Sequence, residues 1–550
     1  MLVIKGGTVI DGKGGDPLTD GSVVIEGRRI QQVGPSKTVV PPKDATIIDA
    51  TGKFVIPGLI DSHVHYRDYM PQLFLNHGIT SVKDVGNIPE WIVAQRQGIH
   101  QGNIPGPRIF VAGRFGAIKG FPADIDPPGA YPPSEKISNA DEAAGFVKYL
   151  LSFNVDQIKV LYGFPPALLS VIATETHNAG LYVTSHVTIS ARDAASSGVD
   201  GLEHGSGIVQ ALLGESEMEK IYKASSMEQR TTSAFHLMKK ENFKDLAKFL
   251  VDKGTRIIPT FVLWAIAGGK RRDQYDFETL SLLKRQELAY IPQGRYFWWL
   301  RDNQYFWINR PSLGENAETR LRNLQEGYKK YQDFIAMFAD SGGRLVAGTD
   351  TGFMIPALSM HHELQEMVDA GISPMATIVS ATSKGAEFLG PNGKEVGAIE
   401  KGKYADLVVL NGNPLKEIAQ TKNIALVVKD GKLQDLSYDP CFTNPLPSPR
   451  KIETHAHRVP IVTTVSPFVV TEGPKEAVDI QVVGSFFTRF AAVKINAARI
   501  PTKFISPSEL RAVIPASYLG RPGTLPLTVE NPPPEGGESI PVYVMVIFKQ

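Results

Sequence analysis

The sequence predicts an α/β protein with three parts: a (β/α)8 TIM barrel, a small composite β-sandwich from both flanks of the barrel, and a C-terminal all-β immunoglobulin-like domain. Between residues 54 and 394, short apolar β-type runs alternate with helical segments, which is the pattern of such a barrel. Residues 1–53 and 395–435 carry short β-rich runs separated by Gly and Asp, which indicates a small sheet. Residues 460–550 are β-type throughout, and the proline-containing stretch 436–459 is expected to be a linker.

Eight runs in the central part are candidates for the barrel strands. They are residues 55–60, 80–84, 108–111, 157–161, 181–185, 201–203, 256–261 and 344–347. In a (β/α)8 barrel, the catalytic and binding groups lie at the carboxyl ends of the strands. Polar residues that end these runs are therefore the first candidates for a functional site.

The composition limits the classes of function that are open to the chain. Its 550 residues exceed one ordinary core, so two or three domains are expected. The formal net charge of +1, without a basic or acidic block, argues against nucleic acid or an anionic membrane as a partner. Cys441 is the single cysteine, which excludes an intrachain disulfide and a cysteine metal cluster. No run reaches the roughly 18 apolar residues of a membrane span.

Two histidines end the first predicted barrel strand. The run from Val55 to His65 is apolar up to Ile60 and closes with His63 and His65, one residue apart. Side chains alternate along a strand, so both imidazoles point the same way and can bind one divalent metal. The alternative is a histidine satisfied within the core, beside a chance neighbour.

Candidate ligands recur at the ends of later predicted strands. These are Lys159, His186, His204 and Asp350. With His63 and His65, they make six groups from five strands, all expected on one rim of the barrel. Each alone is weak evidence, but six at corresponding positions predict a metal site.

At this point the sequence resembles the amidohydrolase superfamily, in the bacterial branch near imidazolonepropionase-like proteins and metal-dependent Xaa-Pro dipeptidases. The resemblance covers roughly residues 1–435 and is carried by PGLIDSHVH, GITSVKDVG, QIKVLYG, TSHV with GVDGLEHG, AGTDTG, and GAIEKGKYADLVVLNGNPL. These motifs are specific to the superfamily and much less specific to a substrate.

The resemblance implies two divalent metal ions, with zinc foremost and manganese, cobalt or iron also open. The implied ligands are His63, His65 and Asp350 for the more buried metal, His186 and His204 for the second, and Lys159 as a bridge. An ammonium has no acceptor, so Lys159 would have to be carboxylated with CO2 to bridge. The alternative is one metal without this modification, in which His204 hydrogen-bonds the metal-bound water.

The expected chemistry is attack by a water that the metal activates. Asp350 would act as the general base and return the proton to the leaving group. Tyr162, three residues beyond Lys159, would donate to the oxyanion or to a substrate carboxylate. The alternative for Tyr162 is a packing residue, and dipeptidase-like relatives have smaller residues after this lysine. His204 completes the candidate catalytic residues.

The expected function is hydrolysis of an amide or peptide C–N bond in a dipeptide or N-acyl amino acid-like substrate. Two alternatives stay open: a cyclic amide or lactone hydrolase or deaminase with the same site, and a non-catalytic binding protein. We expect a small-molecule partner, no nucleic acid, no membrane span and a homo-oligomer. A bacterial-type protein is indicated, either cytoplasmic or exported with a signal peptide that this sequence lacks.

Two other features bear on function. The long segment 263–330 is expected to form an aromatic lid, or alternatively a buried helical hairpin or a subunit interface. Its clustered aromatic residues are Tyr296, Phe297, Trp298, Trp299, Tyr305, Phe306 and Trp307. Asp84 is expected either to support the site from behind its ligands or to be structural, and His361 and His362 are expected to shape the pocket without binding metal.

The C-terminal part has a resemblance of its own. VTTVSP at 462–467, DIQVVGSFF at 479–487, AVKIN at 492–496 and LTVENPPPEGGES at 527–539 resemble an IPT/TIG domain, which is an immunoglobulin-like sandwich. The resemblance implies a role in binding, packing or oligomerisation.

Overall fold

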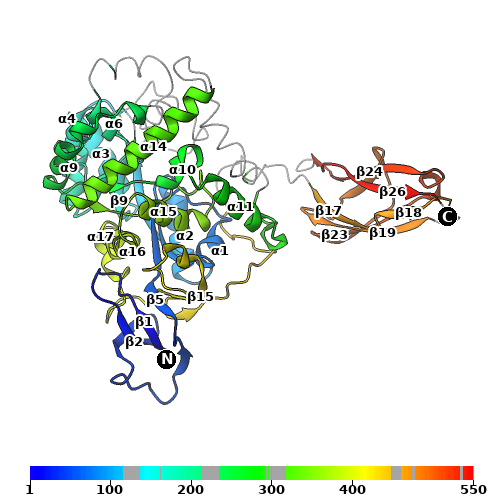
Figure 1. Ribbon diagram of the computed structural model, residues 1–550, viewed down its shortest axis with the longest axis horizontal. Helices are drawn as coiled ribbons and strands as arrows, with labels where there is room; N and C mark the ends of the chain where they lie inside the picture. The colour runs from blue at the N-terminus through cyan, green and yellow to red at the C-terminus, as the bar shows by residue number, and fades with distance from the viewer. Residues whose placement is uncertain are drawn as a thin grey trace. The chain divides into compact units, whose positions relative to one another are not determined.

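The computed structural model describes residues 1–115, 137–161, 163–187, 189–213, 217, 234–292, 295, 299, 317–447, 460–473, 477–532 and 537–548 (Figure 1). The chain divides into two compact units, and each is described by itself. The first comprises Met1–Thr279, Trp299–Ser437 and Asn444–Pro449, and the second comprises Leu280–Trp298, Tyr438–Thr443 and Arg450–Gln550.

One mixed sheet of the first unit combines the two flanks of the barrel region. Its strands are β1 (Leu2–Val9), β2 (Leu18–Glu26), β3 (Arg29–Pro35), β4 (Thr46–Asp49), β5 (Phe54–Pro57), β14 (Leu407–Leu410), β15 (Ile424–Lys429) and β16 (Lys432–Leu433). The order is β16-β15-β14-β5-β1-β2-β3, with β4 paired to β1. β5 and β14 run antiparallel, with Phe54 opposite Leu410 and Pro57 opposite Leu407. Alternating apolar residues such as Val23 and Val409 form its buried core.

The other sheet of this unit has eight parallel strands in chain order. They are β6 (Leu59–Val64), β7 (Ile79–Asp84), β8 (Arg108–Phe115), β9 (Gln157–Val160), β10 (Tyr182–Ser185), β11 (Gly201–Glu203), β12 (Arg256–Ile258) and β13 (Arg344–Leu345). β6, β7 and β9 are buried at every residue, as expected for parallel strands covered on both faces. The mixed α/β class predicted from the sequence is confirmed at this level.

Helices alternate with the parallel strands. They are α1 (Pro71–Leu75), α2 (Pro89–His100), α3 (Ala140–Leu151), α4 (Pro166–Asn178), α5 (Ala191–Ser196), α6 (Ile208–Leu212), α9 (Phe243–Asp252), α10 (Phe261–Gly268), α11 (Arg272–Leu283), α14 (Ala317–Asp340), α15 (Leu358–Asp369), α16 (Pro374–Ser380) and α17 (Ser383–Glu387). Local sequence sets several starts: α2, α4 and α16 begin at proline, and Asn139 caps α3 by accepting from Glu142 N. Among the described helices, none is both long and apolar enough to cross a membrane.

The first predicted barrel strand is wrong in its limits. The run 55–60 divides at Pro57-Gly58, so that β5 belongs to the mixed sheet and β6 begins the parallel sheet. Gly58 N donates to Asp406 O at 2.8 Å, and a Cβ on Gly58 would lie 2.0 Å from Thr80 Oγ1. The chain can change sheets here because glycine tolerates this close approach.

The residues after β13 return to β6. Ser62 N donates to Ala347 O at 3.1 Å, and Asp350 N donates to His63 O at 2.9 Å. β13 itself is shorter than the predicted strand 344–347. These bonds bring the first and last strands of the parallel sheet together at the carboxyl end of β6.

The start of the predicted linker lies against α1 and α2. Asn76 Nδ2 donates to Leu436 O at 2.9 Å, and Trp91 Nε1 donates to Pro447 O at 2.9 Å. Asn444 is buried and donates through Nδ2 to Asp68 O at 3.1 Å. Residues 448–459 of this stretch lie outside the described residues.

The C-terminal part of the chain forms two antiparallel-rich sheets around one core. One sheet has the order β17 (Ile461–Ser466), β19 (Val478–Ser485), β23 (Glu509–Ile514), β22 (Thr502–Ser506). The other has the order β18 (Val469–Thr471), β26 (Val542–Ile547), β24 (Gly523–Asn531), β20 (Ala492–Ile495), β21 (Ala498–Arg499), with β25 (Gly537–Glu538) paired to β24. Buried residues of both sheets, such as Val482 and Val544, form a shared core. The IPT/TIG resemblance stays a prediction.

Candidate metal centre

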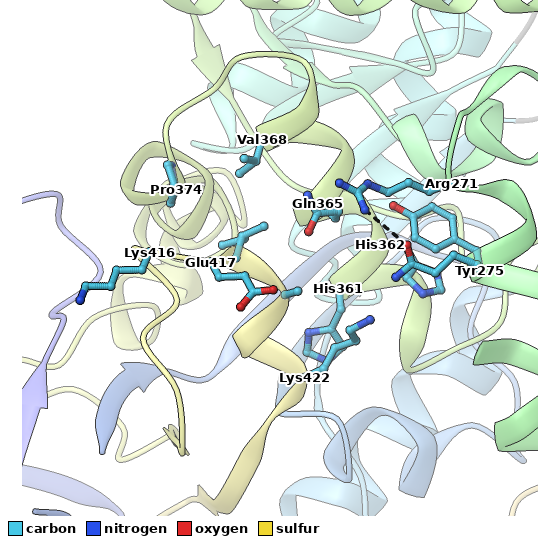
Figure 2. A pocket seen from close by; sticks show the side chains of 13 residues that line it. Arg271, Tyr275, His361, His362, Gln365, Val368, Pro374, Lys416, Glu417 and Lys422 are labelled. Atoms are coloured by element: carbon cyan, nitrogen blue, oxygen red, sulfur yellow. Dashed lines mark hydrogen bonds between the residues drawn. The ribbon is translucent and has the colours of Figure 1, made fainter. Parts of the chain in front are cut away.

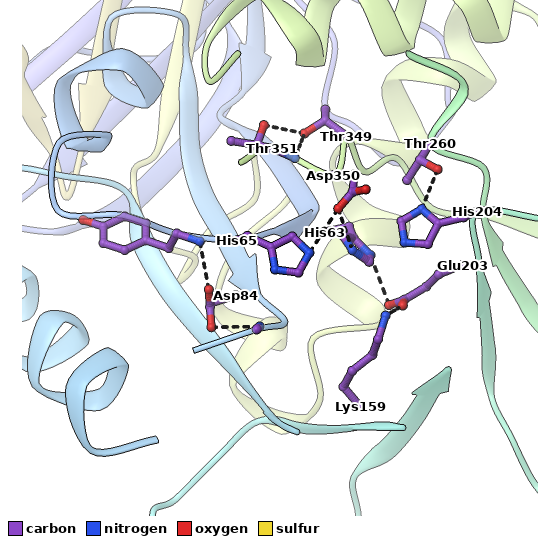
Figure 3. A network of polar contacts seen from close by, with 12 residues as sticks. His63, His65, Asp84, Lys159, Glu203, His204, Thr260, Thr349, Asp350 and Thr351 are labelled. Carbon is purple, nitrogen blue, oxygen red and sulfur yellow. Dashed lines mark hydrogen bonds and ion pairs between the residues drawn. The ribbon is translucent and has the colours of Figure 1, made fainter. Parts of the chain in front are cut away.

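The six candidate ligands predicted from the sequence lie at the carboxyl ends of the parallel strands. Figure 3 shows them together except for His186, which it does not label. Their places are His63 in β6, His65 just after it, Lys159 in β9, and His186, His204 and Asp350 directly after β10, after β11 and beyond β13. Parallel strands end at the same edge of a sheet, which is why residues so far apart in sequence come together.

Two imidazoles converge on one carboxylate oxygen. His63 Nε2 lies 3.3 Å from Asp350 Oδ1, and His65 Nε2 lies 3.1 Å from the same atom. His63 and Asp350 are buried, and His65 is half-buried. The backbone holds this geometry, since Asp350 N donates to His63 O and His65 N donates to Thr351 O at 2.6 Å.

His204 lies on the other side of His63. The ring centroids of His63 and His204 are 4.4 Å apart, and those of His186 and His204 are 4.9 Å apart. His204 Nδ1 lies 2.8 Å from Thr260 Oγ1, and that hydroxyl donates to Pro259 O. Because a hydroxyl carries one proton, Thr260 accepts from His204 Nδ1–H, which leaves the Nε2 lone pair available to bind a metal.

The backbone is strained at three residues around the site. His204, Thr260 and Asp350 have φ values of 60°, 46° and 58°, in the left-handed region. Each such residue costs about 1–3 kcal/mol, and strain of this kind is concentrated at functional sites. The strained residue His204 directly follows β11, and the strained residue Asp350 lies five residues after the end of β13. The backbone conformation at each of these residues sets the direction of the candidate ligand side chain.

Lys159 and Glu203 form a buried pair beside His63. Lys159 Nζ contacts the Glu203 carboxylate, and Glu203 Oε1 lies 3.2 Å from His63 Nδ1. Burial, followed by the charge of Lys83, lowers the pKa of Lys159 well below its usual value. Sequence reasoning missed Glu203, although a glutamate that closes a buried strand next to His204 is a usable signal.

Electrostatics keep the imidazoles neutral and the carboxylate charged. Burial lowers the pKa of His63 to about 4 and that of His204 well below its usual value. For Asp350, burial alone would raise the pKa, but the electrostatic interaction with the His204 imidazole and the contacts with His63 and His65 hold the pKa of Asp350 well below its usual range.

The donor set fits a divalent cation. Among the described residues, His63 Nδ1, His63 Nε2 and Asp350 Oδ1 are buried atoms without a hydrogen-bond partner. The ligand atoms of His63, His65 and Asp350 lie within 4.8 Å of one another, as do those of His63, Glu203 and His204. A lone pair that faces a carboxylate is stabilised by a cation between them, and imidazole with carboxylate suits zinc, manganese, iron or cobalt.

Two loops around His65 are held by Asp84 and Gly86. Asp84 accepts from Tyr66 N at 2.9 Å and from Asn87 N at 3.0 Å, so it ties the segments after β6 and β7 together. A Cβ on Gly86 would lie 2.3 Å from His65 Nδ1 and 3.4 Å from Arg114 Nη1. Arg114 extends β8 beyond its predicted end and lies opposite Lys159 in the neighbouring strand, which the sequence analysis did not anticipate.

The structure describes only some of the residues in two other predicted features, the oxyanion donor Tyr162 and the aromatic lid. Tyr162 lies outside the described residues, as do Tyr296–Trp298 and Tyr305–Trp307 of the predicted lid. Trp299 is buried, with its ring centroid 6.3 Å from that of Tyr69. The aromatic lid therefore stays a prediction.

His361 and His362 lie at a separate pocket of about 290 Å³ between α11, α15 and the segment before β15 (Figure 2). His362 Nε2 lies 2.8 Å from Glu278 Oε2, and the Tyr275 ring stacks on His362 with centroids 3.8 Å apart. His361 Nε2 lies 3.1 Å from His77 O. Both imidazoles thus have polar partners within this pocket.

The fold and the site together define an α/β protein with a candidate divalent-metal centre at the carboxyl ends of eight parallel strands. Residues 321–433 match the Amidohydrolase family. Ochratoxinase from Aspergillus niger is 23% identical over 469 residues, which are 79% of this chain and 86% of that protein. The structure is similar to a crystal structure of a Xaa-Pro dipeptidase with bound methionine in the active site, with a TM-score of 0.57 and 22% identity, covering 79% of this chain and 99% of that one.

A dihydroorotase from Trichlorobacter lovleyi is 48% identical over 68 residues, 12% of this chain, and this match spans 15% of that protein's length. Together these similarities support the amidohydrolase superfamily.

Proposed function

We propose that the protein is a metal-dependent hydrolase that cleaves an amide or peptide C–N bond in a small substrate such as a dipeptide or an N-acyl amino acid. The observation that carries the proposal is the convergence of His63 Nε2 and His65 Nε2 on Asp350 Oδ1. The similarities to ochratoxinase and to a Xaa-Pro dipeptidase support this reaction class.

His63, His65, His204 and Asp350 would hold the metal, with His186 beside them. When bound, a divalent metal polarises the scissile carbonyl and lowers the pKa of water. Asp350 is placed to take a proton from the attacking water and to pass it to the leaving nitrogen. The contact between Thr260 and His204 fixes the imidazole, so that its orientation is set before substrate binds.

We extend the proposal to two metals with a carboxylated Lys159 as their bridge. Its support is the burial of Lys159 in β9, at the edge of the sheet where the imidazoles lie. Carboxylation would replace the present contact of Lys159 Nζ with the Glu203 carboxylate. Zinc is the first candidate for the metal.

For the fold, we propose that the parallel sheet closes as a barrel through the hydrogen bonds between the β6 segment and residues 347–351.

A second candidate function uses the same centre on a cyclic amide or lactone, or for deamination. The 68-residue match to a dihydroorotase is the observation that favours it. Parallel assays of N-acyl amino acids, dipeptides and cyclic amides distinguish the two candidates.

The test is Asp350→Asn. Because asparagine cannot accept the proton, we expect hydrolysis of the best substrate of the panel to fall at least about 10²–10⁴-fold. The measurement is the initial rate with zinc, manganese or cobalt added, and with a chelator as reference.

Asp369→Asn is the matched control, since Asp369 is exposed on α15 and pairs with Arg271. It should keep wild-type activity. Normal turnover by Asp350→Asn would contradict the proposed mechanism.

A further inference from the structure

Glu203 is a buried carboxylate that contacts two candidate ligands of the metal centre, His63 and Lys159 (Figure 3), and also Thr184. Its Oε1 accepts from Thr184 Oγ1 at 2.8 Å and lies 3.2 Å from His63 Nδ1. Its Oε2 faces Lys159 Nζ. Glu203 closes β11, directly before His204, so it is carried by the same strand as a ligand.

The two nitrogens of His63 face different carboxylates. Nε2 lies 3.3 Å from Asp350 Oδ1, and Nδ1 lies 3.2 Å from Glu203 Oε1. An imidazole that binds a metal through one nitrogen carries its proton on the other, and a carboxylate that accepts this proton sets both the tautomer and the ring orientation. The ligand atoms of His65 and Asp350 gather on the Nε2 side of His63, so a metal bound there would leave the proton of His63 on Nδ1.

We propose that Glu203 is a positioning residue, which accepts the Nδ1–H of His63 when a metal is bound and so presents His63 Nε2 to that metal. In the structure, Nδ1 has no hydrogen-bond partner among the described residues, and Glu203 Oε1 lies 3.2 Å away, within reach of this bond. The inference rests on the metal centre of the proposed function. Thr184, which lies in β10, donates a hydrogen bond to Glu203 Oε1 and so orients the carboxylate toward His63. With Oε1 directed at Thr184 and His63 and Oε2 at Lys159, Glu203 acts in this proposal through His63, although its carboxylate also lies in a group with His63 and His204 that could hold a metal.

The test measures zinc affinity, which does not depend on knowing the substrate. Zn²⁺ is titrated into metal-free protein in competition with a chromogenic chelator, for the wild type, Glu203→Gln and Glu203→Asp. We expect both variants to bind about 10–100-fold more weakly, which is the usual effect of losing the partner of a ligating histidine. Glu203→Asp keeps the charge but shortens the side chain, so its loss of affinity would assign the effect to position and not to charge.

The absorption spectrum of the Co²⁺-loaded protein gives a second readout. Bands in the visible range report the geometry of the ligand set. We expect them to shift in Glu203→Gln, because His63 changes its tautomer or orientation. Unshifted bands together with wild-type zinc affinity would overturn the inference.

Glu366→Gln is the matched control, because Glu366 is also a buried carboxylate and accepts from Tyr328 Oη at 2.7 Å. It should keep wild-type zinc affinity even if its melting temperature falls.

If the Glu203 variants do not fold, Thr184→Val is the fallback variant. It leaves the Glu203 carboxylate in place but removes the hydroxyl that donates to it, and we expect a several-fold weaker zinc affinity. Wild-type affinity in folded Thr184→Val would then contradict the inference. A wild type that binds zinc but hydrolyses no amide would contradict the proposed function and leave this test intact.

Discussion

Lys83 is an unusual residue in the parallel sheet, because its whole side chain is buried. It lies in β7 and is fully inaccessible. Its Nζ donates to Gln157 Oε1 at 2.7 Å and lies 4.9 Å from the centre of the Phe388 ring. Burial lowers the pKa of Lys83 to about 7, so the folded protein holds this amine largely neutral above that pH.

This shift predicts a pH dependence of stability. Unfolded lysine has a pKa of 10.5, so between about pH 7 and 10.5 the unfolded chain binds more protons than the folded chain. The free energy of unfolding therefore rises with pH in this window, because the folded chain has to bury a charged amine only at lower pH. As the pH falls from 10.5 to about 7 this stability is lost progressively, and below about pH 7 Lys83 causes no further change. The slope approaches ~1.4 kcal/mol per pH unit for one group.

The measurement compares the wild type with Lys83→Met by urea unfolding of metal-free protein from pH 7.5 to 9. Tryptophan fluorescence suits it, because Trp307 is the last tryptophan and the C-terminal sheets contain none. The free energy of unfolding should rise more steeply in the wild type. Lys248→Met, at an exposed lysine of α9, should follow the wild type. Parallel curves for Lys83→Met and the wild type would contradict the assignment.

Much of the site could be predicted at the residue scale, because its ligands directly follow apolar β-type runs. This rule predicts His63, His186 and Asp350, and the structure brings all of them near one another around His204. Glu203 also ends such a run, but its contact with His63 could not be predicted, because that contact depends on how β6 and β11 face each other across the sheet. That arrangement is a property of the packed molecule, not of either sequence segment.

At the scale of elements, the loop between β7 and α2 limits where His65 can lie. Gly86 packs against the imidazole so closely that any side chain would displace it. Gly86→Ala is therefore expected to weaken zinc binding by about 10–100-fold while the fold is kept. Competition with a chelator measures the affinity, and circular dichroism checks the fold.

Gly145→Ala in α3 is the control for this substitution. A Cβ there meets nothing within 4 Å, so zinc affinity should not change, and the helix should gain about 0.5–1 kcal/mol. If Gly86→Ala bound zinc as tightly as Gly145→Ala, the loop would not determine the position of His65.

Element limits were harder to predict than element types. The apolar run 55–60 looks continuous in sequence, yet it serves two sheets, because Gly58 allows a contact with Thr80 that no other residue would permit. In the same way, the predicted strand 256–261 ends at Ile258, because Thr260 adopts a left-handed conformation and α10 begins at Phe261. Such changes of direction depend on tertiary contacts.

At the scale of the whole molecule, the metal centre and the C-terminal sheets have separate cores. The C-terminal core is built from residues between Val465 and Val546, whereas every candidate ligand lies between His63 and Asp350. A chain that ends at Pro447 is therefore expected to bind the same amount of zinc per chain as the full-length protein.

Elemental analysis of both proteins after purification without chelator measures this. Hydrolysis of the best substrate should persist in the shorter chain. Loss of zinc from a shorter chain that still shows native circular dichroism would indicate that the C-terminal part supports the site.

The mixed sheet has a consequence for biosynthesis. β5 pairs with β14, yet about 350 residues separate Pro57 from Leu407. At about 5–20 residues per second, a ribosome needs roughly 20–70 s to synthesise the intervening chain. During that interval β5 is an open edge that can pair with another nascent chain. The interval between the synthesis of β5 and that of β14 is thus a period of aggregation risk. The yield of folded protein should therefore depend on translation rate and chaperone supply, and not only on the stability of the folded chain.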